Sequence, residues 1–225
     1  MLNSGIDVLL EGINMQRLFG GLLVTARIAF ISIVVGSLLG FILGLIRTSK
    51  SSVIRFVCRF YLEVFRIIPI LVWLFVVYFG VTSLLDIHLD GELVALIIFS
   101  LWGAAEMSDI VRGALESLPK HQIESGRAIG LSFWGLYRYV LIPQAVRRML
   151  PGAINLSTRM VKTTSLVVLI GVIDVVKVGQ QIIERSLLKE PTASFWIYGL
   201  IFILYFVICY PLSKWSQKLE TKWES

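Results

Sequence analysis

Two carboxylates stand at the end of an apolar stretch, where their charge could bind a cation or join a network of ion pairs. Glu106 and Asp109 follow the apolar run over residues 93–105, which is too short to cross a bilayer by itself. With a helix rise of about 1.5 Å per residue, Glu106 lies roughly 20 Å and Asp109 roughly 25 Å from the start of the run, and Arg112 reaches the opposite surface. Because an unpaired charge in the membrane costs at least about 2.5–3.5 kcal/mol, both carboxylates need partners.

A second stretch, residues 151–173, is polar in its first half and apolar after Leu166. The polar half, which cannot face lipid, carries neutral hydrogen-bonding groups and two cations, namely Asn155, Ser157, Thr158, Arg159, Lys162, Thr163, Thr164 and Ser165. Two interpretations stay open. In one, the two carboxylates pair with Arg112, Arg159 or Lys162 as a structural network. In the other, a polar path through the membrane is lined by Glu106, Asp109, Asn155, Thr158, Arg159 and Lys162.

The elements that must position these groups are apolar helices. Of the 225 residues, 56% are hydrophobic and 16% are charged, against about 45–50% apolar usage in soluble domains. This composition predicts an all-α integral membrane protein that forms one transmembrane domain over residues 1–225. About five segments are apolar enough to span a bilayer, at residues 28–46, 67–85, 93–112, 151–173 and 195–212. Residues 18–26 are expected to form a lead-in helix at the outer surface, with Arg27 reaching the headgroups.

Glycines recur at every fourth position of the first span, at Gly36, Gly40 and Gly44. Residues four apart lie on the same face of a helix. One face of this span therefore lacks side chains, and we expect another helix to approach it closely.

The start of the second span carries two local signals. Arg59, Glu63 and Arg66 share one helical face, and their charges predict that they pair with one another. Pro69 follows in the first turns of the span. A proline there is expected to kink the helix, because it lacks the backbone N–H and its ring crowds the preceding turn.

Positive charge is distributed unevenly between the two sides of the predicted membrane domain. Lys and Arg number four in residues 47–59, six in residues 112–148 and three in the C-terminal tail, and all of these lie on one side. The positive-inside rule therefore places the N-terminus outside and residues 117–143 in the cytoplasm. The formal net charge of +6 does not indicate a nucleic-acid partner, because the basic residues cluster at the ends of apolar segments, as expected beside an anionic leaflet of the lipid bilayer.

Residues 117–143 are a semi-polar island between apolar spans. Gly126 and Gly130 are expected to interrupt a first short helix, and Ser132 can cap a second one that ends before Pro143. Apolar side chains at helical spacing in the second helix, together with nearby arginines, give the island the character of a docking surface.

No motif in the sequence is built for catalysis. The phosphate-binding loop G-x-x-x-x-G-K-[ST], the zinc motif H-E-x-x-H and the nucleophile motif G-x-S-x-G are all absent, and there are two histidines. The two cysteines, Cys58 and Cys209, have no metal-ligand spacing. We therefore predict no catalytic residue, no metal site and no cofactor in this chain, so that any energy source lies in another subunit.

The island contains Glu124-Ser125-Gly126, then Gly130, then Val140-Leu141-Ile142-Pro143. These residues and their spacing resemble the E-A-A-x-x-x-G-x9-I-x-L-P motif of bacterial ABC importer permeases. Nearly the whole chain is similar to the polar amino acid permease subfamily, of the glutamine, histidine, arginine or cystine type. Its F-R-G-T-P and E-I-V-R-G motifs resemble Phe65-Arg66-Ile67-Ile68-Pro69 and Asp109-Ile110-Val111-Arg112-Gly113.

The chain departs from the subfamily pattern at four places. These are Ser125-Gly126 for two alanines, Ile67-Ile68 for Gly-Thr, Asp109 for Glu, and Thr163 for Asp or Asn. The first departure lowers helix propensity where the coupling helix should form. The others leave the substrate class open.

The resemblance implies a type I importer architecture in which the island couples the membrane subunit to an ATPase. The coupling residues would be Glu124, Ser125, Gly126, Gly130, Ile142 and Pro143, with ATP and Mg²⁺ bound by the cytoplasmic ATPase partner rather than by this chain. It further implies a second permease copy, as a homodimer or a paralogous heterodimer, and an extracytoplasmic amino acid-binding protein or domain. An amino acid carries a carboxylate and an ammonium group, so a path offering both signs of charge suits it.

The alternative function is a self-contained channel or an ion-coupled secondary transporter, in which the buried acids would bind protons or cations. Five spans without an internal repeat argue against a coupled carrier. An intramembrane enzyme is a third alternative, for which the sequence offers no nucleophile with a base.

Overall fold

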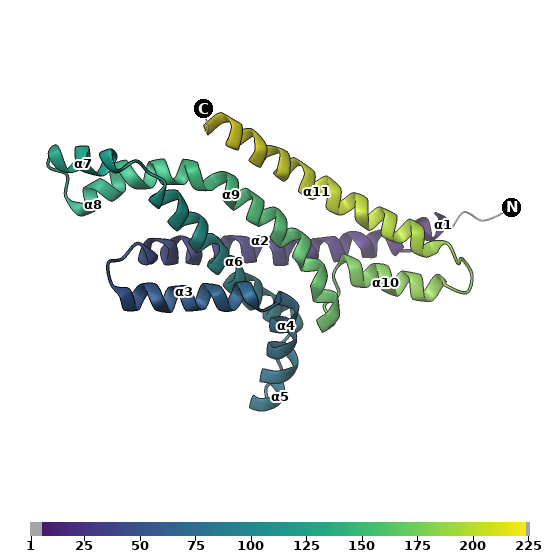
Figure 1. Ribbon diagram of the computed structural model, residues 1–225. Helices are drawn as coiled ribbons and strands as arrows, with labels where there is room; N and C mark the ends of the chain where they lie inside the picture. Colours follow the sequence, from purple (N-terminus) through teal and green to yellow (C-terminus); the bar gives the residue numbers. More distant parts are fainter. Residues whose placement is uncertain (1–5, 224–225) are drawn as a thin grey trace. The chain divides into compact units, whose positions relative to one another are not determined.

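A computed structural model describes residues 6–223 of the chain, and the part so described is helical and contains no strand (Figure 1). The elements in chain order are α1 (Asp7–Leu10), α2 (Asn14–Arg47), α3 (Ser52–Ile67), α4 (Ile70–Phe75), the π-helical turn η1 (Val76–Val81), α5 (Thr82–Leu85), α6 (Gly91–Glu116), α7 (Lys120–Ala128), α8 (Phe133–Leu136), the π-helical turn η2 (Tyr137–Leu141), α9 (Ile142–Thr163), the 3₁₀ helix η3 (Thr164–Ile170), α10 (Val175–Ser186) and α11 (Ala193–Trp223). The all-α prediction is confirmed.

Three of these helices, α2, α6 and α11, are each long and apolar enough to cross a membrane. Two further pairs pass the same test only when their halves are taken together across a short break, Ser52–Ile67 with Ile70–Leu85 and Phe133–Ile170 with Val175–Ser186. The described residues therefore offer three to five spans, in agreement with the expected membrane architecture of about five.

The chain divides into two compact units. The first consists of the described parts of Met1–Ser32, Pro69–Phe99 and Thr158–Pro211, and the second of those of Ile33–Ile68, Ser100–Ser157 and Leu212–Ser225. One boundary falls between Ile68 and Pro69, in the break between α3 and α4. The other four fall within α2, α6, α9 and α11, so each of these helices contributes residues to both units.

The core of the first unit joins α1, the start of α2, α10 and the start of α11. Its buried members are Val8, Leu18, Val175, Val178, Ile182, Ala193, Ile197 and Ile201. Helices α10 and α11 lie side by side (Figure 1) at Gly179, where an added Cβ would stand 2.6 Å from Cδ1 of Ile201. Asp174 begins α10 by accepting a hydrogen bond from the backbone N–H of Lys177 at 2.9 Å, which is the usual work of an N-cap carboxylate.

In the second unit, α2 packs directly on α6 through the three regularly spaced glycines. A Cβ at Gly36 would lie 3.1 Å from the carbonyl oxygen of Ser100, and one at Gly40 would lie 2.5 Å from Cβ of Met107. At Gly44 the corresponding distance to Cβ of Val111 is also 2.5 Å. The expected close approach is confirmed, because these distances leave no room for a side chain.

Two local expectations from the sequence concern α2 and the break at Pro69. Helix α2 is continuous from Asn14 to Arg47, so the separate lead-in helix over residues 18–26 was wrong. Arg27 lies within it and pairs with Glu92 at 2.6 Å. The expected kink at Pro69 is confirmed as a break, since Ile68 and Pro69 are both extended between α3 and α4, as the residue before a proline prefers.

We expect Gly40→Ala to destabilise the protein by about 1–3 kcal/mol, because its methyl group would overlap Met107 and force α2 and α6 apart. The melting temperature of the detergent-solubilised protein should fall by several degrees. Gly20→Ala, in the same helix with open space around it, is the matched control and should leave the melting temperature unchanged or slightly raised. Equal behaviour of the two variants would contradict the close packing.

Candidate functional site

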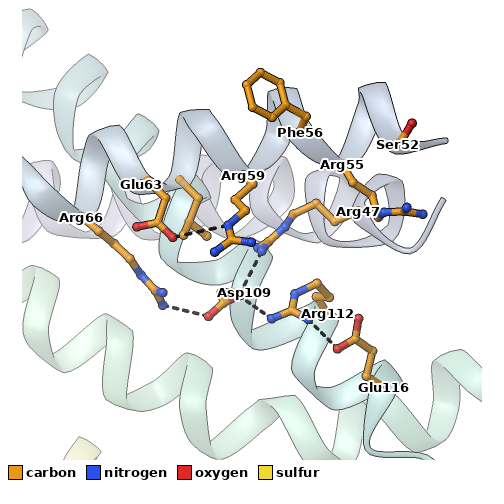
Figure 2. Close-up of a pocket in the computed structure, with 11 residues that line it drawn as sticks. Arg47, Ser52, Arg55, Phe56, Arg59, Glu63, Arg66, Asp109, Arg112 and Glu116 are labelled. Carbon is orange, nitrogen blue, oxygen red and sulfur yellow. Dashed lines mark hydrogen bonds and ion pairs between the residues drawn. The ribbon is translucent and has the colours of Figure 1, made fainter. Parts of the chain in front are cut away.

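The carboxylate of Asp109 on α6 is held by guanidinium groups from three helices (Figure 2). Its Oδ1 lies 3.2 Å from Nη2 of Arg47 and 3.1 Å from Nη2 of Arg112. Its Oδ2 lies 2.8 Å from Nη2 of Arg66. Both oxygens are therefore engaged by charge-assisted contacts, with three guanidinium groups around this one carboxylate.

Two of the three arginines reach Asp109 from the ends of their helices, and the third lies on the same helix as Asp109. Arg47 is the last residue of α2, is buried, and donates from Nη1 to Oγ of Ser108 at 3.1 Å. One turn earlier, Gly44 brings α2 against the same part of α6. Arg66 stands in the last turn of α3, just before the break at Pro69. Arg112 follows Asp109 by three residues on α6 and so shares its face.

Two further carboxylates extend the network. Glu106, one turn before Asp109 on α6, lies 3.4 Å from Nε of Arg66. Glu116, one turn after Arg112, accepts a hydrogen bond from that residue. The predicted pair Arg59–Glu63 is present at 3.9 Å, but Arg66, expected to pair with them, turns to the acids of α6 instead.

A cavity of about 550 Å³ lies between α3, α6 and the end of α2 (Figure 2). Its charged lining comprises Arg47, Arg55, Arg59, Glu63, Arg66, Asp109, Arg112 and Glu116. Phe56 and Leu62 supply apolar surface. Such a cavity can hold a small molecule or headgroup that bears negative charge.

The sequence-predicted path residues fall in both units. Glu106 and Asp109 are brought together through Arg66 in the second unit, where Asn155 donates to Oε1 of Glu220 at 3.4 Å. The other three, Thr158, Arg159 and Lys162, belong to the first unit, and Thr158 is buried there. The role of these six residues in a path remains a prediction.

Sequence reasoning missed Arg47 and Arg66 as partners of the intramembrane acids. The sequence did contain a signal for both arginines, because each stands at the end of an apolar or amphipathic helix rather than inside a loop. What the sequence could not supply was the pairing of α2 and α3 with α6, which joins residues 62 and 43 positions apart in the chain.

The island forms the predicted short first helix, but its second helix is the start of a longer one, and Gly126 does not interrupt the first. Helix α7 runs through Ser125 and Gly126 to Ala128. Gly126 is buried, and a Cβ there would lie 2.5 Å from Cδ1 of Leu136 on α8. Its lack of a side chain therefore lets α7 and α8 close on each other.

The turn between α7 and α8 depends on Gly130 and Ser132. Gly130 has a φ of +82°, a conformation that residues with a Cβ rarely adopt. Oγ of Ser132 accepts the backbone N–H of Gly135 at 3.2 Å, which confirms the predicted cap of the second helix.

The expectation that Ile142 and Pro143 end the second helix was wrong. Helical structure continues from α8 through η2 into α9, which contains Pro143 and Pro151. A proline ring normally collides with the carbonyl four residues earlier. Here the N–H of Ile142 bonds to the carbonyl of Tyr137 in the wider π-helical turn just before Pro143, and this turn relieves the collision.

Large apolar side chains project from the island. Ile129 and Trp134 are each 79% exposed, and Phe133 and Tyr139 are also exposed. Glu124 lies exposed on α7. A patch with aromatic anchors and an acidic neighbour is the composition of a protein-binding surface.

The sequence matches a known family over most of its length. Residues 36–219 fit the family described as binding-protein-dependent transport system inner membrane component. The chain belongs to this family. It is therefore a multi-pass protein of the bacterial inner membrane and the transport component of a multi-subunit system.

Relatives of this inner membrane component carry consistent names. The probable glutamine ABC transporter permease protein GlnP of Bacillus subtilis (strain 168) is 32% identical over 209 residues, covering 93% of this chain and 94% of the relative. The octopine transport system permease protein OccM of Rhizobium meliloti is 35% identical, with coverages of 91% and 89%. The glutamine transport system permease protein GlnP of Escherichia coli (strain K12) is 31% identical, with coverages of 96% and 93%.

Solved structures agree with the family. A chain in the crystal structure of an amino acid ABC transporter with histidines superposes with a TM-score of 0.82 at 26% identity, covering 92% of this chain and 94% of that one. A chain of the MetNI methionine ABC transporter, in an inward-facing conformation, has a TM-score of 0.65 at 19% identity, with coverages of 92% and 96%. The second likeness shows the fold alone.

We expect Asp109→Asn to lower the free energy of unfolding by about 1–3 kcal/mol, because it leaves three guanidinium groups without their shared counter-charge. Thermal unfolding in detergent measures this. Glu63→Gln removes one charge from an exposed ion pair, worth about 0–1 kcal/mol, and is the control. If Asp109→Asn keeps its stability but loses transport, the carboxylate serves the path rather than the network.

Proposed function

We propose that this inner membrane component is the permease subunit of an ATP-driven ABC importer that carries a polar amino acid into the cytoplasm. Relatives covering most of the chain are named for glutamine and octopine transport. The charged groups of both signs around Asp109, together with Asn155, Thr158, Arg159 and Lys162, suit a zwitterionic substrate. In this proposal they line or flank its path.

The observation that carries the proposal is the way the island is tied to α9. Nη1 of Arg148 donates to the carbonyl oxygen of Ser117 at 2.6 Å and to its Oγ at 3.0 Å. Nε2 of Gln144 donates to Oε1 of Gln122 at 3.2 Å. The segment before α7 and the first turn of α7 are thus fastened to the helix that continues from α8, so a push on the island moves α9 with it.

The partner that would push is a cytoplasmic ATPase, which would bind the ATP and the Mg²⁺. The exposed side chains of Ile129, Phe133 and Trp134 would enter a groove on its surface, with Glu124 at the rim. Gly126 and Gly130 allow the compact shape of the island. Ile142 and Pro143 lie where the island joins α9. Ser125, between Glu124 and Gly126, is the last of the six proposed coupling residues.

Two further partners follow from this assignment. A second permease copy, identical or paralogous, would complete the membrane part of the importer. An extracytoplasmic binding protein or domain would deliver the amino acid. In the predicted orientation, with the N-terminus outside, the island and the ATPase lie on the cytoplasmic side, and the binding protein lies on the opposite side.

ATP-dependent uptake by the assembled complex in proteoliposomes tests the function. We expect uptake of one radiolabelled polar amino acid, competed by few others in a panel of single amino acids, and only with the ATPase and ATP present. Uptake by this chain without any nucleotide-binding subunit would overturn the proposal in favour of a self-contained carrier.

The tie between the island and α9 gives a sharper test. Arg148→Gln should reduce amino acid uptake per ATP hydrolysed at least several-fold, because the island can then move without α9, while the ATPase still co-purifies. Arg147→Gln changes the neighbouring exposed arginine and serves as the matched control. Equal uptake-to-hydrolysis ratios in the two variants would show that the tie does not transmit motion.

A further inference from the structure

The cavity between α3 and α6 is not electrically balanced by the residues around it. Five guanidinium groups line it against three carboxylates, which leaves a net charge of +2. Glu106 contacts Arg66 from beside the cavity, and counting it reduces the net charge to +1. A ligand with one negative charge would complete the balance.

The arginines that line the cavity differ in how closely their guanidinium groups are paired with carboxylates. Arg47, Arg66 and Arg112 hold Asp109, yet Nε of Arg112 is buried without a hydrogen-bond partner among the described residues. Arg59 meets Glu63 only at 3.9 Å. Arg55 donates Nη1 to the neutral carbonyl oxygens of residues 49 and 50 at 2.9 Å. The outer part of the cavity therefore keeps uncompensated positive charge.

The same helix presents an exposed apolar face next to these arginines. With about 100° between successive residues of a helix, Arg55 and Arg59 fall on one side of α3. Val53, Val57 and Phe60, all exposed, form the adjoining side, and Leu62 and Phe65 are buried on the opposite side.

Phe56 stands at the border between the charged and the apolar sides of α3. It lines the cavity and is 70% exposed. The basic cavity therefore opens directly onto an apolar surface, an arrangement that suits a ligand with a charged head and a hydrocarbon body.

We propose that the outer part of this cavity, at Arg55 and Arg59, binds the phosphodiester headgroup of one anionic phospholipid of the inner leaflet. Arg55 and Arg59 would donate to the phosphate oxygens. The acyl chains would lie along Phe56 and Phe60. A singly charged phosphodiester matches the residual charge of +1.

The predicted topology supports this ligand. The N-terminal end of α3 follows the basic loop after Arg47, on the side that carries most Lys and Arg and therefore faces the cytoplasm. Basic amphipathic helices at that surface attract anionic lipids, with about 1 kcal/mol for each Lys or Arg near the headgroups. The inference rests on the membrane orientation and not on which amino acid is carried.

Native mass spectrometry of the purified, delipidated full chain, with any subunits that co-purify, tests the proposal. The probes are dioctanoyl phosphatidylglycerol, its phosphatidylcholine counterpart, and glycerol phosphate as a free anion. We expect one tightly held phosphatidylglycerol per chain, weaker binding of phosphatidylcholine, and no competition by glycerol phosphate. Arg55→Gln with Arg59→Gln should weaken phosphatidylglycerol binding roughly 30-fold.

Arg147→Gln with Lys218→Gln is the charge-matched control, since both residues are exposed cytoplasmic cations outside the cavity. Its affinity for phosphatidylglycerol should stay within about twofold of the unaltered protein. An equal loss in the control, equal binding of the two lipids, or efficient competition by glycerol phosphate would each overturn the lipid site. Displacement of the lipid by a transported amino acid would instead assign the cavity to the substrate path. The comparison of phosphatidylglycerol with phosphatidylcholine on the unaltered protein tests the lipid site even if the double variant folds poorly.

Discussion

The charge of Asp109 is the constraint on which the second unit depends. A carboxylate in an apolar helix must be neutralised where it stands, and three arginines from α2, α3 and α6 converge on it. That convergence requires Gly44, because a side chain there would hold α2 away from Val111 and carry Arg47 out of reach. The ion pairs therefore depend on the glycine spacing, because the close packing of α2 on α6 is what brings Arg47 to the carboxylate.

Local signals in the sequence predicted local structure well. The glycine spacing predicted a close helix contact, Ser132 predicted a cap, and Pro69 predicted a break, because each effect acts within a few residues or follows from the absence of a side chain. The all-α membrane class followed from composition. These features needed no knowledge of which helices meet.

Features that depend on tertiary contact were missed. Gly126 has low helix propensity, yet it lies inside α7. Leu136 occupies the space that a side chain at this position would need, so the packing of α8 against α7 requires a glycine here. Pro143 is a helix breaker in isolation, yet a π-helical turn absorbs it. Of the three partners of Asp109, Arg112 was among the predicted candidates, but Arg47 and Arg66 come from distant parts of the chain, and charge alone left Arg112, Arg159 and Lys162 as equal candidates. In each case packing overrode a local preference.

The absence of a helix end at Pro143 changes how the island can act. Because α8, η2 and α9 are continuous, there is no hinge between the docking surface and α9, and bending must occur at Gly130 or between α6 and α7. Further along the same helix, Oγ of Ser216 on α11 donates to the carbonyl oxygen of Pro151 at 2.9 Å, which occupies one acceptor in a proline-containing turn. Within the second unit, α9 is thus bonded to Ser117 and Gln122, before and within the first turn of α7, and to Ser216 and Glu220 of α11. A force on the island would reach α11 through α9, so α9 is the element whose stiffness sets how much of that force is transmitted.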